Sequence, residues 1–278
     1  MNAPNNAPNN APKPITSLTN DRVKAIRALE MRKVRKETGL FVAEGASLLI
    51  TARDHGYRPE TIVYQAGSVE SGINKGLVTW ALKEGAEVLE VSEAVLGKLA
   101  SKDNPQTMLG VFRQKFAPAP QPKAVAEDAT WLALEEVRDP GNLGTILRTS
   151  DAVGIAGVML IGNCCDPYSL EAIRATMGSV FAVPMVKLER EAFLALAKAW
   201  PGDVVATHLE GREDFRAAKY RGPELVLMGS EGPGLSNEVA DAATRRVKIP
   251  MSGTLDSLNL AIATALMVYQ VRGPKLKL

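Results

Sequence analysis

Residues 139–154 read Asp-Pro-Gly-Asn-Leu-Gly-Thr-Ile-Leu-Arg-Thr-Ser-Asp-Ala-Val-Gly and combine an amide, Asn142, with a cation, Arg148. The segment follows a predicted strand and opens a predicted helix, so Asn142 would lie at the helix mouth and could cap the helix or bind a ligand. Arg148 would lie in mid-helix, where most arginines are simply solvent-exposed. The functional alternative for Arg148 is a permanently charged, forked donor beside a phosphate or a ribose oxygen.

A second segment, residues 229–236, reads Gly-Ser-Glu-Gly-Pro-Gly-Leu-Ser and resembles a dinucleotide-binding loop only superficially. Glu231 would put negative charge where a pyrophosphate should sit, and Pro233 lacks an N–H that a phosphate cradle would use. A structural turn is the simpler interpretation. Glycines around one carboxylate, however, suit close backbone approach to a neutral or cationic ligand. S-adenosylmethionine, which carries a sulfonium and no phosphate, is a ligand of this kind.

A third segment, residues 247–260, reads Val-Lys-Ile-Pro-Met-Ser-Gly-Thr-Leu-Asp-Ser-Leu-Asn-Leu. The pattern predicts a strand that ends at Pro250 and a helix that starts near Ser257, with Asp256 or Ser257 as its N-cap. Asn259 would then lie just inside an otherwise apolar helix. Because asparagine has weak helix propensity and a buried amide is costly, Asn259 is expected to have a specific partner.

These segments follow strands of a predicted α/β domain, residues 129–278. Strands that alternate with helices indicate a mostly parallel sheet covered on both faces, whose ligand site lies beyond the carboxyl ends of the strands. The predicted strands are Thr130–Glu135, Gly157–Ile161, Val204–Thr207, Leu225–Met228 and Arg246–Ile249. The predicted helices are Leu143–Val153, Leu170–Met177, Glu191–Trp200, Asn237–Ala243 and Leu258–Val271.

A smaller α/β domain is predicted over residues 15–116. A linker, residues 117–128, separates the two domains, because its alternating prolines favour extended structure. Residues 1–14 repeat Asn-Ala-Pro-Asn with small variations and should form a disordered tail.

The smaller domain begins with a strongly basic stretch. Between Asp21 and Glu37 lie seven cations: Arg22, Lys24, Arg27, Arg32, Lys33, Arg35 and Lys36. The net charge of the chain is only +2, so a nucleic-acid surface must arise from such clustering. For any single one of these cations, a solvated helix face is an equally good explanation.

Composition limits the remaining possibilities. The chain has 278 residues, 46% of them hydrophobic and 23% charged, which suits two globular domains. Its two cysteines are adjacent, so a disulfide framework is excluded and a reducing compartment fits best. We see no apolar run long enough for a bilayer, no secretory signal and no zinc-site spacing. The sequence therefore predicts a cytoplasmic protein that needs neither a membrane nor a metal.

The three segments, in this order over residues 130–272, resemble the SpoU family of RNA 2′-O-ribose methyltransferases, within the SPOUT class. Residues 174–179, Arg-Ala-Thr-Met-Gly-Ser, followed by Pro184, look like a further family element. The N-terminal domain is similar to the family's small RNA-binding domain through residues 39–45, Gly-Leu-Phe-Val-Ala-Glu-Gly.

The resemblance implies S-adenosylmethionine as cofactor, a C-terminal trefoil knot formed by threading the last helix through a loop, and a homodimer with its site at the subunit interface. Its implied cofactor contacts are Thr207, Gly229, Ile249 and Leu258. Its implied catalytic and substrate group is Asn142, Arg148, Glu231, Ser257 and Asn259. The expected RNA contacts are Arg32, Lys33, Arg35 and Arg174.

The implied reaction is methyl transfer to a ribose 2′-hydroxyl. A free guanidinium has a pKa above about 12 and is a poor base. We therefore expect Arg148, beside an RNA phosphate, to stabilise the developing oxyanion, whichever group takes the proton. The two-domain layout favours ribosomal over transfer RNA, because transfer-RNA members often lack this N-terminal domain.

Other functions stay open at this point. A transfer-RNA ribose methyltransferase and a base methyltransferase differ from the favoured hypothesis only in substrate. A nucleotide-binding oxidoreductase or kinase would share a doubly wound sheet. This sequence, however, lacks the phosphate-binding loop of such an enzyme. A non-catalytic RNA-binding or ribosome-assembly protein could share the fold, although the intact polar residues argue against it.

Overall fold

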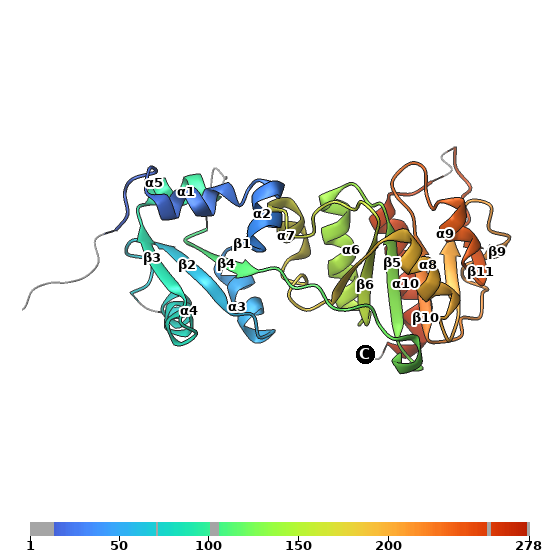
Figure 1. Ribbon diagram of the computed structural model, residues 1–278. Helices are drawn as coiled ribbons and strands as arrows, with labels where there is room; N and C mark the ends of the chain where they lie inside the picture. Colours follow the sequence, from blue (N-terminus) through green and yellow to red (C-terminus); the bar gives the residue numbers. More distant parts are fainter. Residues whose placement is uncertain (1–13, 71, 101–105, 255–256, 277–278) are drawn as a thin grey trace, which may run out of the picture. The chain divides into compact units, whose positions relative to one another are not determined.

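The computed structural model describes residues 14–70, 72–100, 106–254 and 257–276. The chain forms two compact units, which divide between Arg113 and Gln114 (Figure 1). Except for Pro14, the predicted disordered tail lies outside the described residues, as does Asp256, one of the two predicted helix caps.

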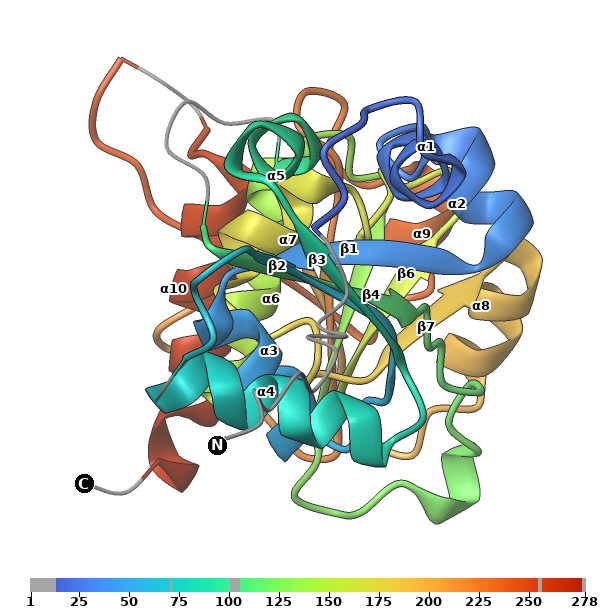
Figure 2. The ribbon, with the colours of Figure 1, turned by 90° about the vertical axis from the view of Figure 1, so that its left-hand side faces the viewer.

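The N-terminal unit contains a four-stranded sheet with strand order β1-β4-β2-β3. The central strand β4 is antiparallel to β1 and β2, whereas β2 and β3 are parallel (Figure 2). Its strands are β1 (Leu40–Glu44), β2 (Pro59–Gln65), β3 (Glu87–Val91) and β4 (Met108–Arg113). Its helices are α1 (Asp21–Ala28), α2 (Arg32–Thr38), α3 (Ala46–Asp54), α4 (Gly72–Lys83) and α5 (Glu93–Ala100).

The basic stretch forms the two helices α1 and α2. Asn20 caps α1, because its Oδ1 accepts a hydrogen bond from Arg22 N at 2.9 Å. Gly39 ends α2 in the left-handed region, with φ of 68°, a conformation that glycine adopts without strain. Val23 and Ile26 of α1 pack into a core with α5 and the sheet, which leaves the cations of α1, namely Arg22, Lys24 and Arg27, exposed.

The C-terminal unit contains a seven-stranded sheet with strand order β7-β6-β5-β10-β8-β11-β9, in which every neighbouring pair is parallel. Its strands are β5 (Thr130–Glu135), β6 (Gly157–Ile161), β7 (Met185–Leu188), β8 (Val204–Thr207), β9 (Glu213–Asp214), β10 (Glu224–Met228) and β11 (Arg245–Lys248). The predicted α/β fold with a mostly parallel sheet is therefore confirmed. Sequence patterning missed the two edge strands, β7 and β9, because each is too short to show a period.

Helices cover both faces of this sheet. Phe193 and Val239, from α8 and α9, pack on one face against alternate strand residues such as Leu225 and Leu227. Helix α6 contacts both α7 and α10, and α10 contacts β10 (Figure 1). The helices are α6 (Pro140–Ala152), α7 (Leu170–Thr176), α8 (Arg190–Lys198), α9 (Asn237–Asp241) and α10 (Leu260–Arg272), with 3₁₀ turns η1 (Pro122–Ala124) and η2 (Gly273–Lys275).

The strand order determines where a ligand can bind. From β5 the chain adds β6 and β7 on one side, and the later strands β10, β8 and β11 lie on the other side. Such a reversal opens a crevice beyond the carboxyl ends of the central strands. The three polar segments follow β5, β10 and β11, so they meet at this edge.

Candidate active site

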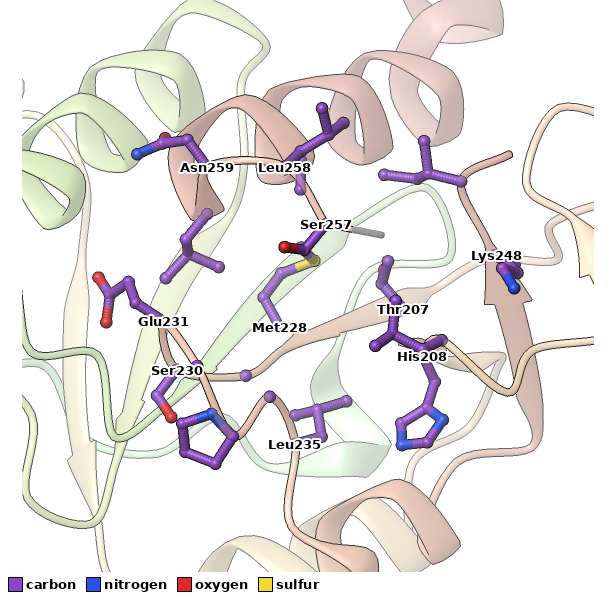
Figure 3. A pocket seen from close by; sticks show the side chains of 18 of the residues that line it. Thr207, His208, Met228, Ser230, Glu231, Leu235, Lys248, Ser257, Leu258 and Asn259 are labelled. Carbon is purple, nitrogen blue, oxygen red and sulfur yellow. The ribbon is translucent and has the colours of Figure 1, made fainter. Parts of the chain in front are cut away.

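A pocket of about 660 Å³ lies at the carboxyl ends of β8, β10 and β11 (Figure 3). This volume suits a ligand of small-molecule size. Residues 207–210 after β8 and 228–235 after β10 form two sides of its wall. Lys248, Ile249 and Met251 after β11, and residues 257–260 with Ala263 at the start of α10, form the rest.

The four expected cofactor contacts all line this pocket, although they come from four separate stretches of chain. They are Thr207, Gly229, Ile249 and Leu258. Three members of the expected catalytic group, Glu231, Ser257 and Asn259, line it too. The structure therefore brings these residues to one cavity, as the strand-end argument requires.

Two features of the pocket suit a ligand that is held partly by backbone. Thr207 Oγ1 is buried and has no hydrogen-bond partner among the described residues, which is costly unless a ligand or water supplies one. A Cβ on Gly229 would lie 2.0 Å from Gly234 C, so only glycine allows the loop to fold back this closely. Reciprocal backbone hydrogen bonds of 3.1 Å between Ser230 and Gly234 close this turn.

Glu231 is held at the rim of the pocket by the chain that joins β5 to α6. Its carboxylate accepts hydrogen bonds from Arg138 N at 3.1 Å, Asp139 N at 3.4 Å and Asn142 Nδ2 at 2.9 Å. Burial raises the pKa of Glu231, but these donors outweigh the burial and lower the pKa below its usual value. Glu231 is therefore ionised at neutral pH and can only accept hydrogen bonds.

Asn142 and Asn259 continue this chain of hydrogen bonds to α10. Asn142 Oδ1 accepts from Asn259 Nδ2 at 2.9 Å, and Asn259 Oδ1 accepts from the N–H groups of Ala261 and Ile262. Both amide orientations are thus set, by a carboxylate at one end and by helix N–H groups at the other. In the described part of the chain, the second N–H of each amide makes no further hydrogen bond, so two donors remain for a substrate oxygen.

The helix starts differ from two predictions. Asp139, not Asn142, caps α6, since Asp139 Oδ1 accepts from Asn142 N at 2.6 Å and Pro140 takes the first helical position. Helix α10 begins at Leu260 rather than near Ser257, and Asn259 is its N-cap rather than an internal residue. The expected partner of Asn259 exists, but it lies on α6 and could not be identified from local pattern.

Arg148 does not line the pocket of its own chain. It is exposed on α6, six residues beyond Asn142, which is about 9 Å along a helix axis. The sequence grouped Arg148 with Asn142 correctly on one helix, but within the described residues the structure leaves the guanidinium outside the cavity.

The expected RNA contacts differ in exposure. Arg32 is exposed, the Lys33 side chain is 85% exposed, and Arg174 is half-buried on α7. Arg35, in contrast, is buried, and its Nη1 donates hydrogen bonds of 2.8 Å to the carbonyls of Leu29 and Glu30. These bonds tie α2 to the end of α1, so the structure corrects the assignment of Arg35 from RNA contact to structural residue.

Sequence reasoning missed Glu210 and Lys248, which also line the pocket. Both residues could have been found from the strand ends, because Lys248 is the last residue of β11 and Glu210 lies shortly after β8. The turn that carries Glu210 is well defined: His208 Nδ1 accepts from Glu210 N at 3.2 Å, and Gly211 N donates to His208 O at 3.0 Å.

Other kinds of site receive no support from the described side chains. Burial raises the pKa of Cys164 and raises the pKa of Cys165 to about 12, so neither thiol is an activated nucleophile. In the described ranges, no three His, Cys, Asp or Glu side chains are grouped to hold a metal ion. No helix in the same ranges is long and apolar enough to span a bilayer.

Comparison with known proteins identifies this architecture. The model of the SpoU rRNA methylase family matches residues 129–269, and that of the MRM3-like substrate binding domain matches residues 20–110. The chain belongs to the SpoU rRNA methylase family. The predicted resemblance to this family is thereby confirmed for both the N-terminal domain and the C-terminal domain of this SpoU chain.

Relatives match the SpoU chain over nearly its whole length. It is 34% identical to an uncharacterized tRNA/rRNA methyltransferase of Synechocystis, with 93% of each chain covered. It is 28% identical to the 23S rRNA (guanosine(2553)-2′-O)-methyltransferase RlmP of Bacillus subtilis, covering 94% of this chain and 100% of RlmP. An AdoMet-bound rRNA methyltransferase structure from Sinorhizobium meliloti superposes with a TM-score of 0.88 at 44% identity, covering 95% and 99% of the two chains.

Proposed function

We propose that this SpoU family member transfers the methyl group of S-adenosylmethionine to a ribose 2′-hydroxyl of ribosomal RNA. The observation that carries the proposal is the hydrogen-bonded chain Glu231–Asn142–Asn259, which leaves two amide donors at the rim of the pocket. Relatives whose names specify 2′-O-methylation of 23S rRNA support the substrate class. Cys164 and Cys165 are free thiols, which fits a reducing compartment, and we therefore place the enzyme in the cytoplasm.

The pocket residues fit S-adenosylmethionine. Thr207 Oγ1 offers a buried hydrogen-bonding group, and the loop around Gly229 allows backbone contact with the ligand. Ile249 and Leu258 offer apolar surface to the adenosyl part. The bound cofactor supplies an electrophilic methyl group. The protein's task is to hold a ribose oxygen in line with it and to stabilise charge on that oxygen.

The chain's own residues can perform that task without a metal. The ionised Glu231 holds Asn142, and Asn142 holds Asn259, so their free N–H groups point in a fixed direction. We infer that these donors and Ser257 orient the ribose. Arg148 then supplies the permanent positive charge that stabilises the developing 2′-oxyanion beside an RNA phosphate.

A homodimer with a shared site is part of the proposal. Ile262, Leu266 and Tyr269 of α10 are 53%, 40% and 51% exposed, and their spacing of four and three residues puts them on one face. An exposed apolar face beside the pocket supports an interface between copies. Arg148 lies outside its own chain's pocket, which fits a site completed by a second copy. We also propose the trefoil knot that the family resemblance implies, with α10 as the threaded helix.

Replacing Ile262 with lysine should separate the dimer. In a twofold interface each substitution acts twice, and each copy loses the burial of a side chain that is 53% exposed, worth about half of the 1.5–3 kcal/mol for full burial. We expect the dimer dissociation constant, measured by analytical ultracentrifugation, to rise at least about tenfold, and methyl transfer to fall with dimer population. Leu82→Lys, at a 61% exposed position on α4, is the matched control. A fully dimeric Ile262→Lys protein would contradict this interface.

The exposed cations of α2 should bind the RNA backbone. Changing Arg32 and Lys33 to glutamine should weaken RNA binding and reduce the slope of log affinity against log salt by about 0.7–0.9 for each phosphate that the protein no longer neutralises. Fluorescence anisotropy over a salt series measures both effects. The control is Arg58→Gln, because the Arg58 side chain is 82% exposed elsewhere on the N-terminal unit. An unchanged slope would indicate that Arg32 and Lys33 only form a solvated helix face and do not bind RNA.

One experiment tests the proposed function directly. The protein is incubated with labelled S-adenosylmethionine and unmodified ribosomal or transfer RNA, and the methylated position is then mapped. We expect a 2′-O-methyl ribose in ribosomal RNA. Methylated transfer RNA or a methylated base would change the substrate. Cofactor and RNA binding without any methyl transfer would indicate a non-catalytic RNA-binding or assembly protein.

A further inference from the structure

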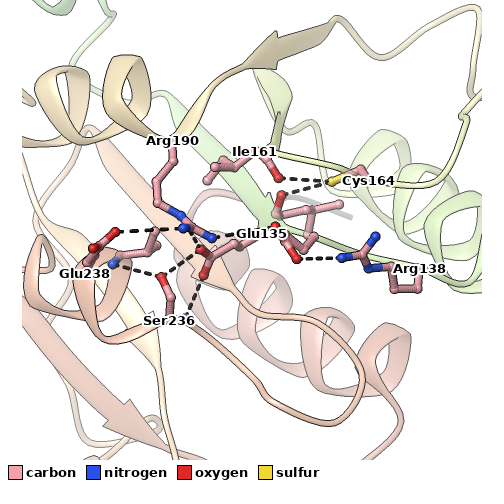
Figure 4. A network of polar contacts seen from close by, with 10 residues as sticks. Glu135, Arg138, Ile161, Cys164, Arg190, Ser236 and Glu238 are labelled. Atoms are coloured by element: carbon pink, nitrogen blue, oxygen red, sulfur yellow. Dashed lines mark hydrogen bonds and ion pairs between the residues drawn. The ribbon is translucent and has the colours of Figure 1, made fainter.

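Glu135, the last residue of β5, is a buried carboxylate outside the pocket (Figure 4). Its side chain is 3% exposed. It accepts hydrogen bonds of 2.7 Å from both Ser236 N and Ser236 Oγ, and one of 3.2 Å from Arg190 Nε. A buried carboxylate is costly unless it is paired and hydrogen-bonded, and these donors satisfy it. Two of them belong to one residue, so Glu135 holds Ser236 in both position and orientation.

Ser236 is the last residue of the glycine-rich loop, residues 229–236, whose other residues line the pocket. Its Oγ also accepts from Val239 N at 3.3 Å and caps α9. Earlier in the same loop, Glu231 is bonded to the backbone of Arg138 and Asp139. The loop is therefore tied at two points to a single stretch of chain, residues 135–139.

This double attachment matters because the loop has little stiffness of its own. Gly232 and Gly234 have φ of 129° and 73°, and glycines of this kind give the chain freedom rather than restraint. The Glu231 carboxylate must nevertheless stay within hydrogen-bond distance of Asn142 Nδ2. Small displacements of catalytic groups reduce rates strongly.

We propose that Glu135 is a positioning residue for methyl transfer: by holding Ser236 it fixes the loop that sets Glu231 against Asn142. The inference rests on the proposed function. Arg190 supports Glu135 from the other side, and Arg190 Nη1 also lies 3.9 Å from Glu238 Oε2, a 66% exposed side chain. Glu135 thus acts at a distance from the substrate, through Ser236 and Glu231.

Glu135→Gln tests the proposal, because the amide keeps the shape but offers only one acceptor oxygen to these donors. We expect kcat to fall by about tenfold to 100-fold, and the affinity for S-adenosylhomocysteine, measured by calorimetry, to fall by a clearly smaller factor, because the turn at Gly229 stays closed while Glu231 loses its fixed position. Hydrogen exchange of residues 229–236 should become faster. Glu238→Gln, which removes a carboxylate beside the same Arg190, should leave kcat, affinity and exchange unchanged.

A double-mutant cycle with Glu231→Gln separates positioning from general destabilisation. If Glu135 acts through Glu231, the double variant should turn over no more slowly than Glu231→Gln alone. Multiplying effects, or a wild-type kcat in Glu135→Gln, would overturn the proposal. Should Glu135→Gln not melt cooperatively, Ser236→Ala replaces it in the same cycle and must show the same non-additivity. A wild-type protein that methylates no RNA would instead refute the proposed function.

Discussion

Arg148→Ala is expected to reduce methyl transfer by about 10³-fold while S-adenosylhomocysteine still binds with near-normal affinity. The reason is geometric. Arg148 is exposed on α6 and does not line the pocket, so its removal takes no cofactor contact from its own chain. Its removal does take away the positive charge that we propose stabilises the developing oxyanion. Single-turnover kinetics at saturating cofactor and RNA measure the chemical step.

Two further variants sharpen this test. Arg148→Lys keeps the charge but not the forked donor, so it should recover only part of the missing rate. Arg216→Ala removes an exposed arginine, paired with Asp214, that lies outside the catalytic group and should leave the rate unchanged. Turnover near that of the wild type in Arg148→Ala would refute the catalytic assignment, whatever its effect on RNA affinity.

Gly229→Ala is expected to remove cofactor binding almost completely. The added Cβ would lie 2.0 Å from Gly234 C and 2.1 Å from Leu235 N, which are backbone atoms that cannot move aside as a flexible side chain could. The loop must then open at the wall of the pocket. We expect affinity for S-adenosylhomocysteine to fall by at least about 100-fold, because a well-packed site tolerates little displacement. Isothermal calorimetry measures this fall.

Gly253→Ala is the matched control for this steric argument. Gly253 lies in the loop between β11 and α10, and a Cβ there would meet nothing within 4 Å. The same chemical change should therefore leave affinity and melting temperature close to those of the wild type. If Gly229→Ala bound the ligand normally, the loop would not form the cofactor wall.

Much of the fold could be predicted from local sequence pattern. Apolar runs such as Leu225–Met228 indicate strands buried on both faces, and the helices between them indicate a parallel sheet. The order of the polar segments also revealed the family. The two edge strands of the larger sheet, β7 and β9, escaped because four residues and two residues are too few to carry a period.

The pocket residues could be named from sequence, but their connections could not. Asn142 and Asn259 are separated by 117 positions, and Asn142 and Glu231 by 89. The strand order sets β10 beside β5 and so brings Glu231 to Asn142, whereas the packing of α10 on α6 brings Asn259 to Asn142. The N-cap of α10 could not be predicted from local pattern for the same reason. Asn259 is oriented by Asn142 on α6 as well as by its own helix.

For this protein, then, the sequence by itself determined the class of fold, the family and the strand ends that carry chemistry, because periodicity and motif spacing are local properties. Tertiary structure decided which polar groups are satisfied. It buried Arg35, exposed Arg148, and set Glu135 behind the glycine loop. Burial and hydrogen bonding depend on neighbours distant in the chain, and no local pattern records them.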